Sequence, residues 1–140
     1  MKKRLFSLGF VVVFMLSMCC VNADAIETRA STTLSLFTAS TSKGDNKGEV
    51  KINYDVQASK MADEVGISTI EIYESDGSYV TTITGTTRNG LIRTGTTRHK
   101  STYVYKGTSG VSYYAVVTGF ATVGSDSDDR TVTTGSTKAP

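Results

Sequence analysis

The clearest pattern in the chain is an alternation of apolar and polar residues over positions 49–58. Val50, Ile52, Tyr54, Val56 and Ala58 fall on one side of this alternation, and Lys51, Asn53, Asp55 and Gln57 on the other. A period of two residues is typical of a strand with one buried face. A weaker strand is predicted at 33–41, joined to the first by a polar turn at 43–48.

A β-hairpin is predicted over residues 67–84, where two strand-like runs flank Ser75-Asp76-Gly77-Ser78. Asp-Gly between two such runs is a strong hairpin signal, because the turn needs positive φ. A two-residue loop places Ile70 opposite Ile83. In the same register Tyr73 lies opposite Val80, so that apolar residues pair across the ladder.

The rest of the chain combines one poorly apolar stretch with clear strands. Residues 85–100 hold few apolar side chains, and we expect one long connection there with at most a short edge strand at 90–94. Further strands are expected at 101–106, at 112–123 and, as a Thr-rich edge, at 129–134. About seven short strands with no helical period predict an antiparallel β-sandwich.

The sequence Gly110-Val111-Ser112-Tyr113, followed by Ala115 and Val117, resembles the tyrosine corner of fibronectin type III and immunoglobulin-like domains. The resemblance implies that the Tyr113 hydroxyl bonds to upstream backbone. It also implies the strand order A (32–41), B (49–59), C (67–74), C′ (79–85), E (101–106), F (112–123) and G (128–134). We therefore expect an all-β, immunoglobulin-like (fibronectin type III-like) sandwich, in which Tyr54 or Val56 replaces the usual strand B tryptophan.

The chain as a whole also resembles uncharacterised small secreted single-domain proteins of Gram-positive bacteria. This resemblance rests on residues 61–67 leading into Ile70-Glu71-Ile72-Tyr73, and on Tyr114-Ala115-Val116-Val117-Thr118. It implies an exported bacterial protein and names no activity.

The N-terminus has the features of an export signal. Basic residues at 2–4 precede an apolar run at 5–21, and Val21-Asn22-Ala23 offers small residues for cleavage. We expect a secreted protein; an uncleaved anchor or a lipoprotein modified at Cys19 are the alternatives. The expected organisation is a signal peptide (1–23), a flexible N-terminal segment (24–31), the β-sandwich domain (32–135) and a flexible tail (136–140).

Removal of the signal changes the charge and the available chemistry. The chain has 15 Lys and Arg against 13 Asp and Glu, and three basic but no acidic residues lie in 1–23, so the mature charge is −1. General affinity for nucleic acid therefore has no support, and no membrane contact is expected after cleavage. Cys19 and Cys20 leave with the signal, which excludes a disulfide or thiolate site.

The strongest binding candidate is a basic stretch. Residues 77–125 contain no acidic residue, whereas Arg88, Arg93, Arg98 and Lys100 fall within them. Guanidinium groups match phosphate and carboxylate, so this stretch is a candidate site for an anionic polymer. The plainer interpretation is a solvated loop whose charges protect an edge from aggregation.

Tyr114 is a second candidate. If Tyr113 faces the core, Tyr114 faces the other way. It then joins an aromatic surface suited to sugars or protein partners, for which the other candidates are Tyr73, Tyr79, Tyr103 and Tyr105. Cross-strand packing is the alternative interpretation.

Catalytic chemistry has little support in the sequence. His99 is the only histidine, and we expect the charges of Arg98 and Lys100 to oppose its protonated form. A nucleophile elbow, a phosphate-binding loop and a zinc-protease motif are all missing. The acidic turn at 126–129 lacks the spacing of a calcium loop. We expect no enzyme activity, no cofactor and no metal site.

These observations predict a secreted, non-catalytic binding or surface-interaction module. Its expected partner is a cell-envelope or host polymer, or a protein. The alternative is a structural protein that self-associates when its first or last strand pairs with the edge of a second copy. A small hydrolase has no positive support.

Overall fold

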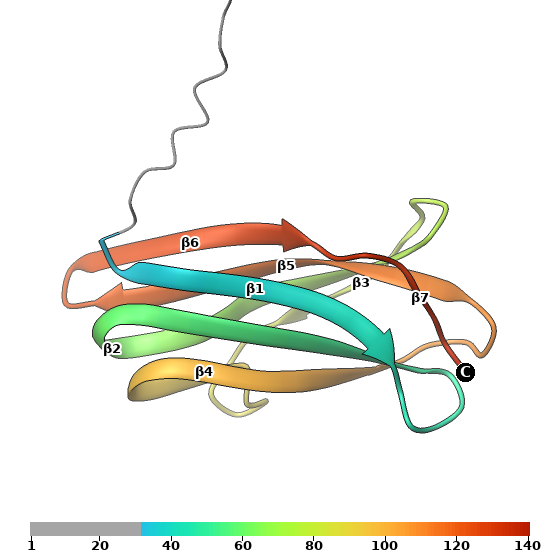
Figure 1. The fold of residues 1–140 in the computed structure, drawn as a ribbon, viewed down its shortest axis with the longest axis horizontal. Helices are drawn as coiled ribbons and strands as arrows, with labels where there is room; N and C mark the ends of the chain where they lie inside the picture. The colour runs from blue at the N-terminus through green and yellow to red at the C-terminus, as the bar shows by residue number, and fades with distance from the viewer. Residues whose placement is uncertain (1–31) are drawn as a thin grey trace, which may run out of the picture.

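The computed structural model describes residues 32–140; the predicted signal peptide (1–23) and N-terminal segment (24–31) lie outside the described residues. This part of the chain forms seven β-strands (Figure 1). They are β1 (Leu34–Lys43), β2 (Glu49–Glu74), β3 (Tyr79–Thr84), β4 (Ile92–Lys106), β5 (Ser112–Val123), β6 (Asp126–Thr133) and β7 (Thr137–Lys138). Within it there is no helix long and apolar enough to span a membrane.

β2 is one continuous strand of 26 residues, where the sequence predicts two strands at 49–59 and 67–74. Its ladder with β4 shifts register between Gln57 and Ala62, and the side chains of residues 59–61 are exposed. The strand turns there but stays extended (Figure 1), because extra unpaired residues bend a strand without ending it. Its first half pairs with β1 and β4, and its second half with β3, β4 and β5.

β4 corrects the prediction of a long connection at 85–100 with at most a short edge strand at 90–94. The strand runs unbroken from Ile92 to Lys106, and β2 pairs with it at both ends, Gly66 opposite Ile92 and Glu49 opposite Lys106. Gly66 permits this close approach, since a Cβ there would collide with the Leu91 main-chain oxygen. Among the described strands β4 pairs with β2 alone, so it is an edge strand. Polar composition is normal at an edge, which is why apolar periodicity missed it.

The sheet curls over its own core and forms the predicted antiparallel sandwich. One half consists of β1, the first half of β2 and the second half of β4. The other half consists of β3, the second half of β2, β5 and β6. Seven antiparallel strands without a helix in residues 32–140, in one sheet curled as a half-barrel, confirm the predicted all-β fold class.

The core lies between these halves. Phe37 of β1 packs on Gly119 of β5, where a Cβ would lie 2.6 Å from the ring. The largest fully buried side chains are Leu34, Ile52, Ile67, Ile70, Ile72, Leu91, Val50, Val56, Val65 and Val117.

At the open side of the curl, β1 and β6 lie next to each other (Figure 1). Side chains join them: the Thr33 amide and hydroxyl donate to Asp128 at 2.9 and 2.6 Å. Arg130 also donates to the Leu34 carbonyl at 3.1 Å. These hydrogen bonds connect the edge of β1, the first strand, to that of β6, the predicted last strand.

The tyrosine corner is present. The Tyr113 hydroxyl accepts a hydrogen bond from the Thr108 amide at 2.9 Å, and the side chain is buried. Gly107 lies against the ring, where a Cβ would come within 2.7 Å of it, and Tyr105 meets it edge-on at 5.4 Å between centroids. The hydroxyl therefore bonds to upstream backbone, as the resemblance implies.

The C-terminal residues 136–140 do not form the free tail expected from the sequence. β7 pairs with Ser112 and Tyr113 of β5, and Ala139 is buried. The Gly48 amide donates to the Pro140 carbonyl at 2.6 Å, and the Gly110 amide to the Ala139 carbonyl at 2.9 Å. Backbone hydrogen bonds, which no side-chain pattern reveals, hold this segment on the domain.

Candidate functional site

The structure brings together two of the four predicted basic residues. Arg98 and Lys100 lie on β4 and point outward from the half-sheet of β1, β2 and β4; Lys100 lies directly opposite Asp55, and Arg98 reaches Asp55 from its place opposite Gln57. Arg88 is exposed in the turn before β4, and Arg93 lies opposite buried Val65. Arg88 and Arg93 therefore do not belong to the site formed by Arg98 and Lys100.

Arg98 forms a two-pronged ion pair with Asp55. Its Nε and Nη2 donate to Oδ1 and Oδ2 of Asp55 at 2.8 and 2.5 Å. The hydrogen bond from Arg98 lowers the pKa of the Asp55 carboxyl, which stays charged. Among the ion pairs of residues 32–140, none includes Lys100. Its ammonium forms no ion pair of its own, although its charge also helps to lower the pKa of Asp55.

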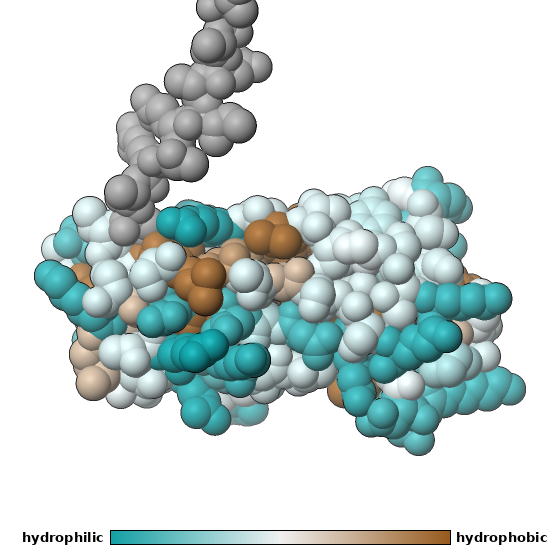
Figure 2. Space-filling view, in the orientation of Figure 1, coloured by the Kyte–Doolittle hydropathy of each residue, from teal (hydrophilic) through white to brown (hydrophobic). Residues whose placement is uncertain are grey.

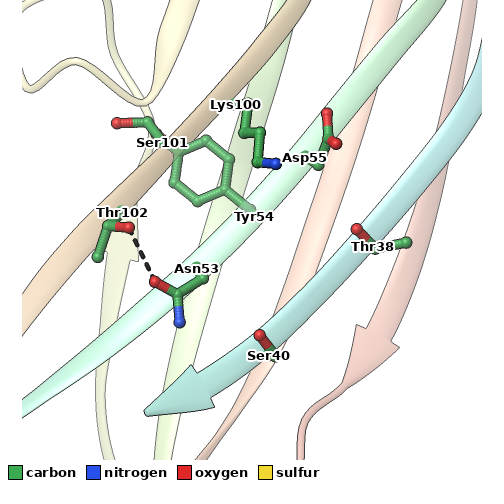
Figure 3. Close-up of a pocket in the computed structure, with 8 residues that line it drawn as sticks. All are labelled: Thr38, Ser40, Asn53, Tyr54, Asp55, Lys100, Ser101 and Thr102. Carbon is green, nitrogen blue, oxygen red and sulfur yellow. Dashed lines mark hydrogen bonds between the residues drawn. The ribbon is translucent and has the colours of Figure 1, made fainter. Parts of the chain in front are cut away.

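Beside Lys100 the sheet surface forms a shallow hollow of about 380 Å³. Its outward side chains form two rows across three strands, Thr38–Asp55–Lys100 and Ser40–Asn53–Thr102 (Figure 3). Tyr54 and Ser101 also line it, with side chains that belong to the other face of the sheet.

Asn53 is fixed at the centre of the hollow. Its Oδ1 accepts from the Thr102 hydroxyl at 2.8 Å (Figure 3), and its Nδ2 donates to the Ser42 hydroxyl at 2.9 Å. The side-chain bonds of the described residues use neither the Thr38 nor the Ser40 hydroxyl. A preset amide, two open hydroxyls and one ammonium are groups that bind a polar, hydroxylated or anionic ligand.

Sequence reasoning missed the residues of β1 and β2 in this hollow. The signal was present, because the alternation at 49–58 puts Lys51, Asn53, Asp55 and Gln57 on the face of the strand away from the core. Recognising the hollow requires the register of β1 and β4 against this strand, which places Thr38 and Lys100 on either side of Asp55.

Tyr114 lies on the outside of the other half-sheet. Its ring stacks on Tyr73 of β2 at 5.3 Å and 10°, and Tyr73 meets Tyr79 of β3 at 5.7 Å and 71°. Tyr103 and Tyr105 pack instead against the core from β4, where they alternate with the exposed Thr102 and Val104. The predicted aromatic surface therefore has three tyrosines, which we call the tyrosine row.

The register of the hairpin creates this row. Ile70 lies opposite Ile83, as predicted, but an irregularity after Ile72 places Tyr73 opposite Tyr79 and not Val80. The Tyr73 hydroxyl donates to the Glu71 carboxylate at 2.9 Å, a bond that raises the pKa of Tyr73.

His99 is buried and does not lie among catalytic partners. Its Nε2 is 2.7 Å from the Gly90 carbonyl and 3.1 Å from the Tyr54 hydroxyl, and its buried Nδ1 has no partner among the described residues. Burial lowers its pKa, and Arg93 adds to the effect against the opposing Gly90 bond. The expected cause was wrong: Arg98 and Lys100 point to the opposite face of β4.

The acidic turn has a structural use. Asp128 accepts the two bonds from Thr33, and Asp63 accepts from the Gly124 amide at 2.7 Å. Over residues 32–140 no three His, Cys, Asp or Glu side chains cluster in a way that could hold a metal ion.

Comparisons with known proteins do not identify a family for this chain. No family model matches the chain, and no curated protein matches it. One solved structure with some similarity is the crystal structure of Parabacteroides merdae beta-glucuronidase with glycerol in its active site. The identity is 11%, the TM-score is 0.39, and the match covers 72% of this chain but only 13% of that chain. Similarity at this level does not bear on function.

Proposed function

We propose that this protein is an exported, non-catalytic binding module that holds an anionic, hydroxylated polymer of the cell envelope in the hollow beside Lys100. The observation that carries the proposal is the Lys100 ammonium, which forms no ion pair among the described residues, next to the open hydroxyls of Thr38 and Ser40. A polymer that carries both hydroxyls and phosphate or carboxylate groups can bind to the ammonium and to both hydroxyls.

The surroundings of the hollow favour an anion. β4 carries Arg93, Arg98, Lys100 and Lys106 and no acidic residue. Asp55 is the carboxylate of the hollow, and Arg98 already pairs with it. The charge that a ligand meets is therefore positive.

Export and the lack of catalysis are supported by the sequence and by His99. The basic residues, apolar run and small residues at 1–23 have the form of a signal peptide. His99 bonds to Tyr54 and Gly90 and not to a nucleophile or carboxylate. A buried imidazole is out of hydrogen-bond reach of an outside substrate and does not serve as its general base.

Binding is favoured over self-association through strand edges. The edge pairing expected from the sequence uses the first or the last long strand, and here β1 and β6 are tied to each other through Thr33, Asp128 and Arg130. An edge that is already covered is a poor template for another chain.

The test is co-sedimentation with isolated Gram-positive cell walls, intact or stripped of their anionic polymers. We expect retention on intact walls, and Lys100→Glu should reduce it strongly because the free cation becomes an anion. Arg88→Glu makes the same charge change outside the hollow and should bind like the natural chain. Equal retention on stripped walls, or equal loss in both variants, would refute the proposal.

A further inference from the structure

We propose that a second copy of this chain docks on the tyrosine row, and that it does so with the basic face around Lys100. The basic face is defined as the outward side of β1, β2 and β4, with Arg98, Lys100, Leu36 and Val104. The acidic face is the outward side of β3, β2 and β5, with Glu71 and the tyrosine row. This inference does not depend on the proposed polymer binding.

Charge divides the molecule into two unlike halves. Residues 32–140 hold equal numbers of basic and acidic residues, so there is no net repulsion between copies. No Lys or Arg occurs at 61–87 or at 107–129, which include the second half of β2, β3 and β5. No Asp or Glu occurs in β4. In Figure 2 hydrophilic side chains gather over the turn after β1 and over parts of β4.

Apolar groups accompany the charges on both faces. Leu36 and Val104, which are 38% and 42% exposed, stand at the two ends of the basic face, beyond the rows of the hollow. On the acidic face Tyr79 is 60% exposed and lies beside Tyr73 and Tyr114. The three tyrosines are contiguous, as at an interaction surface, whereas Leu36 and Val104 are single exposed residues.

The chemistry of the two faces is complementary. Aromatic rings attract Lys and Arg cations over their faces, and Glu71 adds a carboxylate beside the row. The acidic face thus offers tyrosines and a carboxylate to the Lys100 side chain of another copy, in which Arg98 already pairs with Asp55. The two faces lie on opposite outer sides of one sandwich, so each copy keeps one face unused after pairing. Such a head-to-tail contact builds open chains of copies and not closed dimers.

The test is sedimentation velocity of the purified exported chain over a range of concentrations. It is run at ionic strengths of about 10 mM and about 1 M, where the Debye length is about 30 and about 3 Å. We expect assemblies that grow with concentration at low salt and dissociate at high salt. Glu71→Lys and Lys100→Glu should each raise the concentration for half-assembly about tenfold, because like charges then face each other.

Mixing the two variants provides the decisive measurement. Lys100 of the Glu71→Lys protein meets an intact Glu71 on the Lys100→Glu protein. In the other contact the two substituted positions meet, again with opposite charges. Assembly should therefore return in the mixture. Lys60→Glu, at the exposed bend of β2, is the matched control and should assemble like the natural chain. Monomers at every concentration, salt-independent assembly, or no recovery on mixing would overturn the inference. Glu71→Lys leaves the hollow intact. Co-sedimentation of this variant with cell walls therefore separates a failure of the docking inference from a failure of the proposed function.

Discussion

Replacing Tyr113 by Phe tests the tyrosine corner directly, because it removes one oxygen atom and leaves the ring in place. The Tyr113 hydroxyl is the acceptor for the Thr108 amide at 2.9 Å, and the residue is 4% exposed. Without it, the Thr108 N–H loses its protein acceptor. An unsatisfied donor costs about 1–3 kcal/mol, and because this bond is only partly buried we expect about 1–2 kcal/mol.

Urea unfolding followed by far-UV circular dichroism measures this loss. The midpoint should fall while the slope with urea stays the same, since the fold does not change, and the melting temperature should drop by roughly 5–10 °C. Tyr105→Phe is the matched control: its ring contacts Tyr113, and its hydroxyl has no hydrogen-bond partner among the described residues. Equal losses in the two variants, within about 0.5 kcal/mol, would show that the bond does not matter.

Three further perturbations follow from the contacts. The pKa of His99 is lowered by burial, so His99 of the unfolded chain takes up a proton at a higher pH than His99 of the folded chain. The stability of the fold should therefore hold above about pH 6.5 and fall as the pH drops below it. Melting curves measured over this pH range should lose that dependence in His99→Leu. Gly66→Ala pushes a Cβ into the Leu91 oxygen and should cost more than about 1 kcal/mol in urea unfolding. Deleting residues 136–140 removes the β7 ladder and the burial of Ala139; a loss below about 1 kcal/mol would contradict the observed contacts.

The sequence predicts strands well where one face is buried and poorly where pairing alone makes the strand. The alternation at 49–58 and the run at 112–123 reappear in β2 and β5 because their apolar residues fill the core. β4 was missed over residues 92–100, where its side chains are mostly polar and exposed. Its existence depends on hydrogen bonds to β2, and hydrogen bonding leaves no mark on side-chain composition.

The candidate site was predictable only in part, for the same reason. The sequence identifies Arg98 and Lys100 as cations and Asp55 as a polar residue of a strand. It does not say that Arg98 forms the ion pair with Asp55, while Lys100 forms none among the described residues. That distinction follows from the register, in which Lys100 lies directly opposite Asp55 and Arg98 reaches it from the neighbouring position.

One local irregularity determines where the tyrosine row points. In β2 the buried residues Ile67 and Ile70 are three positions apart, and the register with β5 shifts between Ile67 and Thr69. A regular strand buries every second residue, so this shift exchanges the two faces of the strand beyond it. Glu71 and Tyr73 face outward because of it, while Ile70 and Ile72 enter the core. The polar and aromatic character of the outer face is therefore a consequence of backbone pairing at residues 67–69, and a composition count could not reveal it.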